Sequence, residues 1–308
     1  MRPILNFLIL SIINTALKLD VSNALEVMNM QCSDEDIDWQ FNEICEPYNS
    51  CIITNINSTN VYTVDRTLHE FKCLIIIDSF VHEIPSNIFM TLKSNITNLH
   101  ANNVSISQLR RISFPFAQKL EHVDLSWNAI YELHEMFFYD AVNLVTLNLS
   151  HNLIGEISPN VFEKLDSLQI LDLSYNQIST IPFDLFQPLR NLAYLNLRNN
   201  RFQLKFGIFP RNIRMLDLSF NNLEIQQKFK IFSLLEKLET LLLHGNRIEN
   251  IHQSIYDSNL RFLGLSENLF PCNILADVIL TGKTHDMRII AEHIVKNTSN
   301  IYGIKCIE

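Results

Sequence analysis

The stretch Leu168-Gln169-Ile170-Leu171-Asp172-Leu173-Ser174-Tyr175-Asn176 decides the fold, because its pattern Leu-x-x-Leu-x-Leu-x-x-Asn recurs along most of the chain. Counted from its first apolar residue, the pattern begins at positions 71, 96, 120, 144, 168, 192, 213, 238 and 260. The steps between these starts are 25, 24, 24, 24, 24, 21, 25 and 22 residues. The copies at 71 and 96 are degenerate, whereas the last seven all close on an asparagine: Asn128, Asn152, Asn176, Asn200, Asn221, Asn246 and Asn268.

A repeat of this period is typical of a leucine-rich-repeat solenoid. Leu171 and Leu173 stand two residues apart, the spacing at which strand side chains share one face, so both are expected to point into the core. Asp172 and Ser174 are then expected to point outward, onto the concave side. The sequence therefore predicts an α/β leucine-rich-repeat solenoid: a curved horseshoe with a parallel β-sheet on its concave face.

The closing asparagines and a set of phenylalanines have predicted structural roles. An asparagine amide both donates and accepts hydrogen bonds, so it can satisfy backbone groups where the chain turns inward. Loss of one such asparagine should cost about 1–3 kcal/mol. A phenylalanine stands 18 residues after each of five strand starts, and we expect these side chains to form one stacked column in the convex side of the core: Phe89, Phe114, Phe138, Phe162 and Phe186.

The N-terminus has the features of a secretory signal peptide. Met1-Arg2 precedes an apolar run over residues 4–17, and Ser22-Asn23-Ala24 provides a small-x-small cleavage site. We place cleavage after Ala24, with Ala16 as the weaker alternative. An uncleaved anchor is the competing interpretation, but the run is short for a spanning helix. The prediction is a secreted, extracellular protein with no stable membrane span in the mature chain.

Four segments follow from the repeat boundaries: a signal peptide at 1–24, an N-terminal cap at 25–70, about nine leucine-rich repeats at 71–268 and a C-terminal cap at 269–308. The 308-residue chain carries a formal net charge of −9. Removal of the signal peptide leaves 22 basic and 32 acidic residues, a net charge of −10. Such a chain is a poor candidate for binding nucleic acid through phosphate contacts.

All six cysteines lie outside the regular middle of the chain, which predicts that disulfide bonds staple both caps. Cys272 and Cys306 stand apart from the others and should pair with each other. The four N-terminal cysteines allow three connectivities, of which we favour Cys45–Cys51 together with Cys32–Cys73. There is no Cys-x-x-Cys motif, so neither a zinc ribbon nor a thioredoxin-type site is indicated.

Five Asn-x-Ser/Thr sequons are glycosylation candidates in an exported protein: Asn57, Asn95, Asn103, Asn148 and Asn297. Asn148 also occupies a position where this repeat often carries asparagine, so a purely structural role is the alternative. The two roles are compatible.

No sequence motif argues for an enzyme. Thr281-Gly282-Lys283-Thr284 resembles the end of a phosphate-binding loop, but the glycine that the loop needs five residues earlier is Asp277. His69-Glu70 and His134-Glu135 each lack the second histidine of a zinc-protease helix. We therefore predict a non-catalytic protein with no cofactor and no metal site.

The candidate binding residues lie between the leucines. The outward position before the closing asparagine carries Trp127, His151, Tyr175 and Phe220, and a second outward row includes Tyr194. Large aromatic side chains are good anchors in interfaces, so we predict ligand binding through these five residues of the concave face. Strand propensity alone also favours aromatics, which is the structural alternative. The irregular turns near 201–230 are a second candidate surface.

The ends of the chain carry a closer resemblance. The stretch Cys45-x5-Cys51-Ile-Ile-Thr-Asn-Ile and the closing Asn300-Ile-Tyr-Gly-Ile-Lys-Cys306 resemble the insect secreted leucine-rich immune proteins. Mosquito members of that family hold complement-like thioester proteins in the haemolymph, so the resemblance implies innate immunity and a complement-like thioester partner. Longer members continue into linking cysteines and a coiled coil. Neither precedes Glu308, so this chain resembles a short, coil-less member.

Two functional hypotheses follow. The first is a secreted recognition protein of innate immunity that binds a protein or a microbial surface ligand through the concave face. The second is an adhesion or structural component of the extracellular matrix or cell surface, acting through the convex side or by lateral association. Fold alone does not identify the ligand.

Overall fold

A computed structural model describes residues 30–31, 50–54, 71–77, 79–84, 89, 95–109, 113–201, 209–224, 232, 234–256, 259–292, 294 and 298–308 of the 308. The predicted signal peptide, Cys32, Cys45, Asn57 and Asn297 lie outside these residues, and so do residues 202–208 and 225–230 of the irregular stretch.

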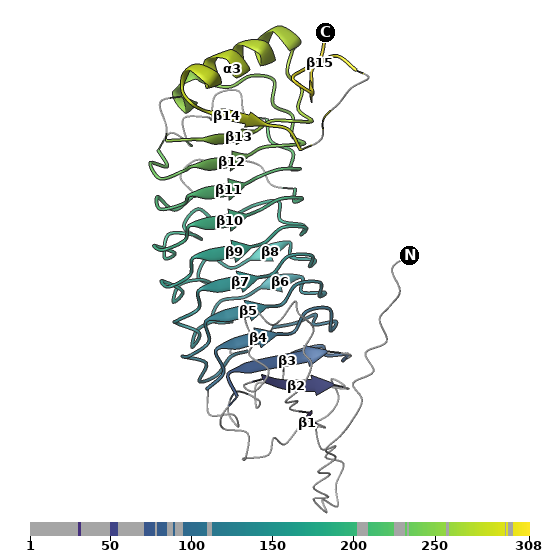
Figure 1. Cartoon of the computed structure of the whole chain (residues 1–308). Helices are drawn as coiled ribbons and strands as arrows, with labels where there is room; N and C mark the ends of the chain where they lie inside the picture. Colours follow the sequence, from purple (N-terminus) through teal and green to yellow (C-terminus); the bar gives the residue numbers. More distant parts are fainter. Residues whose placement is uncertain are drawn as a thin grey trace, which may run out of the picture.

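The backbone forms a solenoid whose turns contribute to one twelve-stranded sheet, as the repeat predicts (Figure 1). Neighbouring repeat strands are parallel and in register; Leu147, for example, pairs with Leu171, which pairs with Leu195. Each copy of the pattern supplies one strand: β3 (Cys73–Ile77), β4 (Asn98–His100), β5 (His122–Asp124), β7 (Thr146–Asn148), β9 (Ile170–Asp172), β10 (Tyr194–Asn196), β11 (Met215–Asp217), β12 (Thr240–Leu242) and β13 (Phe262–Gly264).

The sheet continues past the repeats at both ends. β2 (Ser50–Thr54) pairs in parallel with β3, and β1 (Met30–Gln31) pairs antiparallel with β2. β14 (Arg288–Ile290) extends the sheet beyond β13. Four shorter strands and one 3-10 turn lie outside the main sheet: β6 (Glu132–Leu133) paired with β8 (Glu156–Ile157), β15 (Asn300–Ile301) paired with β16 (Ile304–Lys305), and η2 (Gln253–Ile255).

The closing asparagines form the hydrogen-bond ladder that the sequence predicts. Asn176 is buried, and its Nδ2 donates to the carbonyl oxygens of Leu149 at 3.0 Å and Leu173 at 3.1 Å. Its Oδ1 accepts the backbone N–H of Ile154 at 2.9 Å. The same pattern of bonds recurs at Asn152 and Asn200. Each asparagine therefore ties its own turn to the turn before it.

The core confirms the burial of the five predicted phenylalanines and the stacking of Phe114, Phe138 and Phe162, whereas Phe89 meets Phe114 edge-on at an interplanar angle of 77°. All five side chains are buried, with at most 1% of their surface exposed. The ring centroids lie 5.4 Å apart for Phe89 and Phe114, 5.5 Å for Phe114 and Phe138, and 6.4 Å for Phe138 and Phe162. These rings are structural, as expected.

The expected orientation of Ser174 was wrong. β9 ends at Asp172, so Ser174 already lies in the turn that leaves the strand, and it is only 3% exposed. The equivalent Ser126, Ser150, Ser219 and Ser266 are buried in the same way. Only Asp172 of the two expected residues reaches the concave surface.

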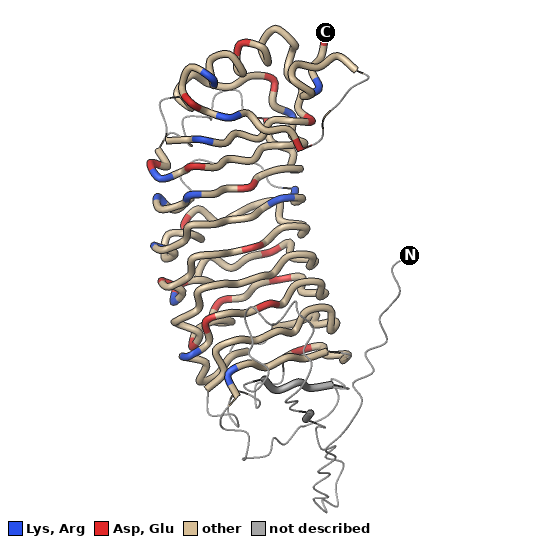
Figure 2. The backbone as a smooth tube through the Cα atoms, in the orientation of Figure 1, with Lys and Arg blue, Asp and Glu red and all other residues tan. Residues whose placement is uncertain are grey.

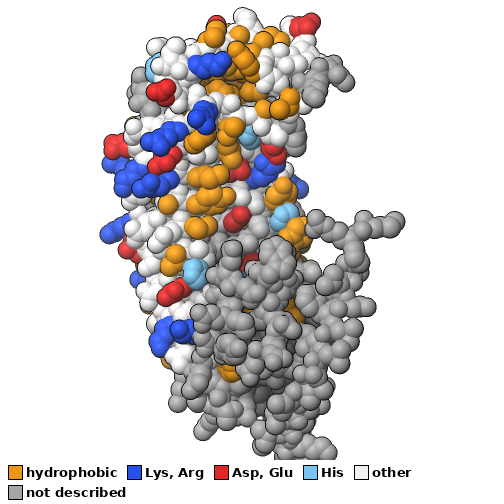
Figure 3. Space-filling model, in the orientation of Figure 1, with side chains coloured by type: hydrophobic (Ala, Val, Ile, Leu, Met, Phe, Trp, Pro, Cys, Tyr) orange, Lys and Arg blue, Asp and Glu red, His pale blue; other side chains and the backbone are white. Residues whose placement is uncertain are grey.

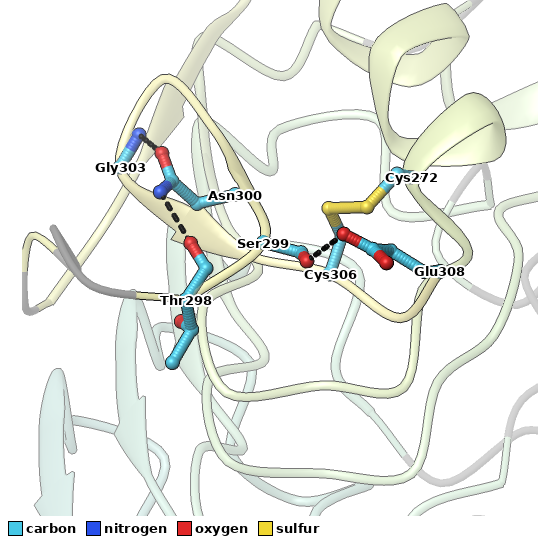
Figure 4. The surroundings of a disulfide bond; sticks show 7 residues. All are labelled: Cys272, Thr298, Ser299, Asn300, Gly303, Cys306 and Glu308. Atoms are coloured by element: carbon cyan, nitrogen blue, oxygen red, sulfur yellow. Dashed lines mark hydrogen bonds between the residues drawn. A yellow bond between two sulfur atoms is a disulfide. The ribbon is translucent and has the colours of Figure 1, made fainter.

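The C-terminal end of the solenoid is covered by the helix α3 (Cys272–Thr284), which buries Leu275, Val278 and Ile279 (Figure 1). The predicted disulfide between Cys272 and Cys306 is present, with a Cα–Cα distance of 4.9 Å (Figure 4). It ties the start of α3 to the last strand segment. The segment 281–284 forms the final turn of α3, which removes the loop that a phosphate-binding motif would need.

Near the chain end, Ser299 donates to Glu308, and the amide of Asn300 bonds both Thr298 and Gly303, closing the β15–β16 hairpin (Figure 4). At the other end of the solenoid, Cys73 is disulfide-bonded. The connectivity of the N-terminal cysteines remains a prediction. In the described part of the chain, no helix has both the length and the apolar character that crossing a membrane requires.

Candidate functional site

The residues before the closing asparagines share a left-handed backbone conformation. Trp127, His151, Tyr175 and Phe220 have φ angles of 57°, 52°, 53° and 54°. They therefore occupy the turn at the edge of the sheet, where the chain leaves each strand. We call this set the left-handed row: Trp127, His151, Tyr175, Asn199, Phe220, Gly245 and Glu267. Asparagine and glycine tolerate this conformation readily, but large aromatic residues adopt it at a cost of about 1 kcal/mol or more.

Three members of the row stack face to face. The rings of Trp127 and His151 lie 3.8 Å apart at an interplanar angle of 7°, and those of His151 and Tyr175 lie 4.1 Å apart at 10°. We call these three side chains the ring ladder. Trp127 is 57% exposed and Tyr175 is 40% exposed. Because the faces of the inner ring are covered, the ladder presents to solvent its ring edges and the outer face of Trp127.

The ladder changes the chemistry of its central ring. Partial desolvation lowers the pKa of His151, while the nearby carboxylate of Asp172 acts in the opposite direction. A neutral imidazole between an indole and a phenol is therefore the favoured state near pH 7. Stacking of this kind contributes about 0.5–1.5 kcal/mol per ring pair beyond burial, which offsets the cost of the backbone conformation.

An arginine follows the ladder on the next turn. The Nε of Arg198 donates to the Tyr175 hydroxyl at 3.4 Å, and its guanidinium carbon lies 4.4 Å from the centroid of the Phe220 ring. Both terminal nitrogens of Arg198 bind the carboxylate of Glu292, at 3.1 and 2.5 Å. Glu292 follows β14, so this ion pair joins residues 94 positions apart. The bond to Glu292 is the main cause of the raised pKa of Arg198.

Phe220 is consequently not part of the ring ladder. Arg198 lies between Phe220 and Tyr175. The ring of Phe220 packs over Gly245, where an added Cβ would lie 2.3 Å from Cδ1 of Phe220. Glycine at that position of the left-handed row thus leaves room for the Phe220 ring.

Tyr194 lies on a strand of the sheet and not in the left-handed row. It lies on β10, in register with Ile170 and Met215. Burial raises its pKa first, and the carboxylates of Asp172 and Asp217 add to the increase. The structure therefore brings together Trp127, His151 and Tyr175 of the five predicted residues, and places Tyr194 and Phe220 beside them. Figure 3 shows hydrophobic side chains in a band across the strands.

The ladder is bordered on the sheet by alternating acids and amides. One aspartate or asparagine stands at the last strand position of each of five successive turns, and its Oδ1 accepts the backbone N–H two positions later, at 2.8 to 3.0 Å. The Nδ2 of Asn196 also donates to Oδ2 of Asp172 at 3.0 Å. We call this set the acid–amide row: Asp124, Asn148, Asp172, Asn196 and Asp217. An amide between each pair of carboxylates keeps like charges apart on adjacent strands.

Burial raises the pKa of Asp217, an effect that hydrogen bonds from Ser219 and the charge of Arg198 oppose. Asn148 belongs to the same row, and its Oδ1 accepts from the backbone N–H of Ser150 at 3.0 Å and from its hydroxyl at 2.8 Å. Both roles of Asn148, structural residue and glycan acceptor, remain compatible. Asn103 is exposed, whereas Asn95 accepts a hydrogen bond from Nζ of Lys119 at 2.7 Å. Occupancy of all five sequons remains a prediction.

Sequence reasoning missed Arg198 and Glu292 as site residues. An arginine in a row of serines was the available signal, but its partner lies too far along the sequence to be inferred. Among the described residues, no group of three or more His, Cys, Asp or Glu side chains is arranged to hold a metal ion.

Two family models match the middle of the chain. The leucine rich repeat models match residues 142–202 and 116–130, which include the turns that carry the ring ladder. The chain is a leucine-rich-repeat protein. Neither of the models that match this leucine-rich-repeat protein describes a catalytic family. No curated protein sequence matches it.

The leucine-rich-repeat protein is similar to several solved structures. A leucine-rich-repeat protein of Leptospira interrogans is 22% identical with a TM-score of 0.58, covering 73% of this chain and 62% of the other. A chain of the Drosophila Toll–Spatzle complex is 21% identical with a TM-score of 0.58, covering 75% of this chain and 34% of the other. Human 5T4 is 20% identical with a TM-score of 0.58, covering 81% of this chain and 87% of the other.

These likenesses establish the fold and nothing finer, because all three identities are low. The leucine-rich-repeat protein also spans less than two thirds of the Leptospira and Drosophila chains that it matches. The resemblance of its ends to the mosquito immune family has no counterpart among these matches. Solved leucine-rich-repeat structures nevertheless include binding proteins, such as a partner in the Toll–Spatzle complex.

Proposed function

We propose that this leucine-rich-repeat protein is a secreted, non-catalytic recognition protein of innate immunity. It binds a protein or a microbial surface ligand through the concave sheet, at the edge formed by the ring ladder. The observation that carries the proposal is the exposure of Trp127 and Tyr175, which flank one histidine in a single stack.

Three features of the ladder favour binding. Exposed tryptophan and tyrosine are the side chains most enriched among residues that dominate interface energies. The stack holds both rings in place before a ligand arrives, so little side-chain entropy is lost on binding. Tyr194 and Phe220 extend the surface along the neighbouring turns, the latter beneath Arg198.

The immune assignment rests on two likenesses. The two ends of the chain resemble the mosquito immune proteins, for which a complement-like thioester protein is the implied partner. The Toll–Spatzle complex is described as a hub in Drosophila development and innate immunity. Export through the predicted signal peptide and glycosylation at sequons away from the ring ladder belong to the same proposal.

A role in adhesion or in the extracellular matrix is the second candidate. Large apolar side chains are also exposed away from the strands, among them Phe183 at 65% and Leu234 at 63%. A protein that associates laterally would use such residues. It would be retained with matrix or membrane fractions, whereas a recognition protein would be recovered from the surrounding fluid.

A capture experiment with matched variants tests the proposal. The full chain is immobilised and exposed to haemolymph or to bacterial cells, and bound material is compared between the wild type, Trp127→Ala/Tyr175→Ala and Phe183→Ala. Phe183 is an aromatic residue of at least equal exposure outside the sheet, so its removal controls for general loss of apolar surface. We expect capture to be lost only in the double variant. Equal capture by all three proteins would refute the ring ladder as the binding surface.

A further inference from the structure

We propose that the ring ladder, together with Asp124 and Asp172, is the docking surface for a basic segment of a protein partner. The arginine or lysine side chains of that segment pack against the rings and carboxylates. This inference rests on the proposed function and specifies the chemistry of the ligand. It follows from an arginine that the molecule already places beside the ladder, and from the distribution of charge around the rings.

Arg198 shows what this surface can hold. Its guanidinium touches three kinds of group: the hydroxyl of Tyr175 at 3.4 Å, the ring of Phe220 at 4.4 Å from its centroid, and the carboxylate of Glu292 at 3.1 and 2.5 Å. A flat cation between aromatic rings and a carboxylate is a favourable arrangement, because the ring quadrupole and the carboxylate both attract it.

The other end of the ladder offers the same groups without a cation. Trp127 is the most exposed ring of the ladder. The equivalent position on the preceding turn is Asn103, which has the same left-handed backbone, with a φ of 55°, but no ring to stack on Trp127. Asp124 of the acid–amide row supplies a carboxylate on the same turn as Trp127, and Asp172 supplies another two turns later, on the turn of Tyr175. The outer face of Trp127 is therefore placed to receive a cation as Phe220 does.

The described residues provide no basic side chain to fill this place. Among the described residues of 95–190 the only lysines and arginines are Lys119, Lys164 and Arg190, and Nζ of Lys119 donates to Oδ1 of Asn95 at 2.7 Å. Lys164 lies 3.4 Å from Glu163 and 5.8 Å from the centroid of Tyr139, and Arg190 lies 3.8 Å from Asp166. Both are thus engaged in the turn segments outside the main sheet, away from the ladder.

Charge is distributed very unevenly along the solenoid (Figure 2). Residues 120–190 contain ten acidic side chains against two basic ones, a net charge of −8, whereas residues 191–308 contain eleven acidic and fourteen basic ones. The ladder lies within the acidic part. A segment of opposite charge would be attracted to it over a distance of about 8 Å at physiological ionic strength.

Acids also border the ladder on its second side. The turns of Trp127 and His151 continue from the left-handed row into the short strands β6 and β8, which carry Glu132 and Glu156. Glu156 is exposed, and Glu132 lies 2.8 Å from Nε2 of His134. The rings therefore run between carboxylates of the acid–amide row and these two glutamates, which is the complement of a basic, partly apolar segment.

The acid–amide row allows a clean test. Asn148 and Asn196 accept the same backbone hydrogen bond as Asp124 and Asp172 do, so Asp124→Asn/Asp172→Asn removes two charges while the bond remains possible. The matched control is Asp166→Asn/Asp184→Asn, which removes two exposed charges from the same stretch but outside the sheet.

The probe is a fluorescent nona-arginine peptide, and its neutral counterpart is a peptide of nine citrullines. Binding to the full chain is followed by fluorescence anisotropy in about 0.15 M NaCl, an ionic strength that screens exposed charges beyond roughly 8 Å. The proteins compared are the wild type, both charge variants and Trp127→Ala/Tyr175→Ala. Circular dichroism and thermal unfolding confirm that each variant is folded.

We expect the wild type to bind the arginine peptide and not the citrulline peptide. Asp124→Asn/Asp172→Asn and Trp127→Ala/Tyr175→Ala should each weaken binding at least tenfold, and the control less than twofold. If both charge variants lose the same amount of peptide affinity, the peptide is bound only by the overall negative charge of this stretch, and the inference is overturned. Equal binding of both peptides, no binding to the wild type, or undiminished binding to Trp127→Ala/Tyr175→Ala would overturn it as well.

The capture experiment separates this inference from the proposed function. If capture of a natural ligand depends on Trp127 and Tyr175 while the arginine peptide fails to bind, the ladder is a binding site for a ligand of another class. If the peptide binds through the ladder while capture of the natural ligand is the same in the wild type and in Trp127→Ala/Tyr175→Ala, the proposed function is wrong.

Discussion

The hydrogen bonds of the closing asparagines predict which pairs of Asn→Ala substitutions have additive effects on the free energy of unfolding and which do not. Asn176→Ala removes the acceptor of the buried Ile154 N–H and one donor to each of the carbonyl oxygens of Leu149 and Leu173. These carbonyls keep a partner, because Asn152 also donates to Leu149 and Asn200 also donates to Leu173. The single change therefore leaves one buried backbone group unpaired, which should lower the free energy of unfolding by about 1–3 kcal/mol.

Removal of two neighbouring asparagines has a different result. In Asn176→Ala/Asn200→Ala, Leu173 loses both donors, so two N–H groups and one carbonyl are left unpaired. In Asn152→Ala/Asn200→Ala, no carbonyl loses both donors. The adjacent pair should therefore show an extra loss of about 1–3 kcal/mol beyond the sum of its single changes, whereas the separated pair should be additive to within about 0.5 kcal/mol.

Urea unfolding followed by circular dichroism measures both double-mutant cycles, and a constant m-value shows that the same structure unfolds in every variant. The separated pair serves as the control, since it removes the same number of amides. Equal coupling in the two cycles, or none in either, would refute the assignment of shared carbonyls to consecutive asparagines.

Three further predictions concern other parts of the fold. A Cβ at Gly264 would lie 2.3 Å from Nε2 of the buried His244 ring, so Gly264→Ala should lower the unfolding free energy by about 1–3 kcal/mol; Gly155→Ala, with nothing within 4 Å, should change it little in the same urea assay. Cys272→Ser should destabilise the chain by about 4 kcal/mol, read from the urea midpoint with and without reductant. The lowered pKa of His151 means that the unfolded chain binds the proton more readily, so unfolding free energy should fall as pH drops from about 7.5 through 6.5; His151→Gln should reduce the slope of that profile, to which His100 contributes as well because burial also lowers its pKa.

The residues that face the core could be assigned from the sequence because their positions repeat. Leu171 and Asn176 recur at fixed spacing, and the chemistry of each allows one role: burial for the first, hydrogen bonding at a turn for the second. The disulfide between Cys272 and Cys306 followed from their isolation. Each of these assignments depends only on local spacing and on the regular stacking of turns.

The surface was less predictable because it depends on backbone angles and on distant partners. The sequence placed Trp127 and Tyr175 in one row but could not show that the row is left-handed, nor that His151 fits between the two rings. Ser174 looked like an outward residue by the two-residue rule, yet the strand had already ended. The pair of Arg198 and Glu292 joins turns 94 residues apart, beyond any local pattern.

The alternation of the acid–amide row has a consequence for how such a chain can change in length. Deletion of one 24-residue turn, residues 144–167, would bring Asp124 directly beside Asp172 on adjacent strands, with no amide between them. Like charges directly opposite each other destabilise a sheet. Loss of two turns keeps the order of acid and amide intact. In this part of the solenoid, loss of a single turn that carries the amide should therefore be less well tolerated than loss of a two-turn unit of about 48 residues.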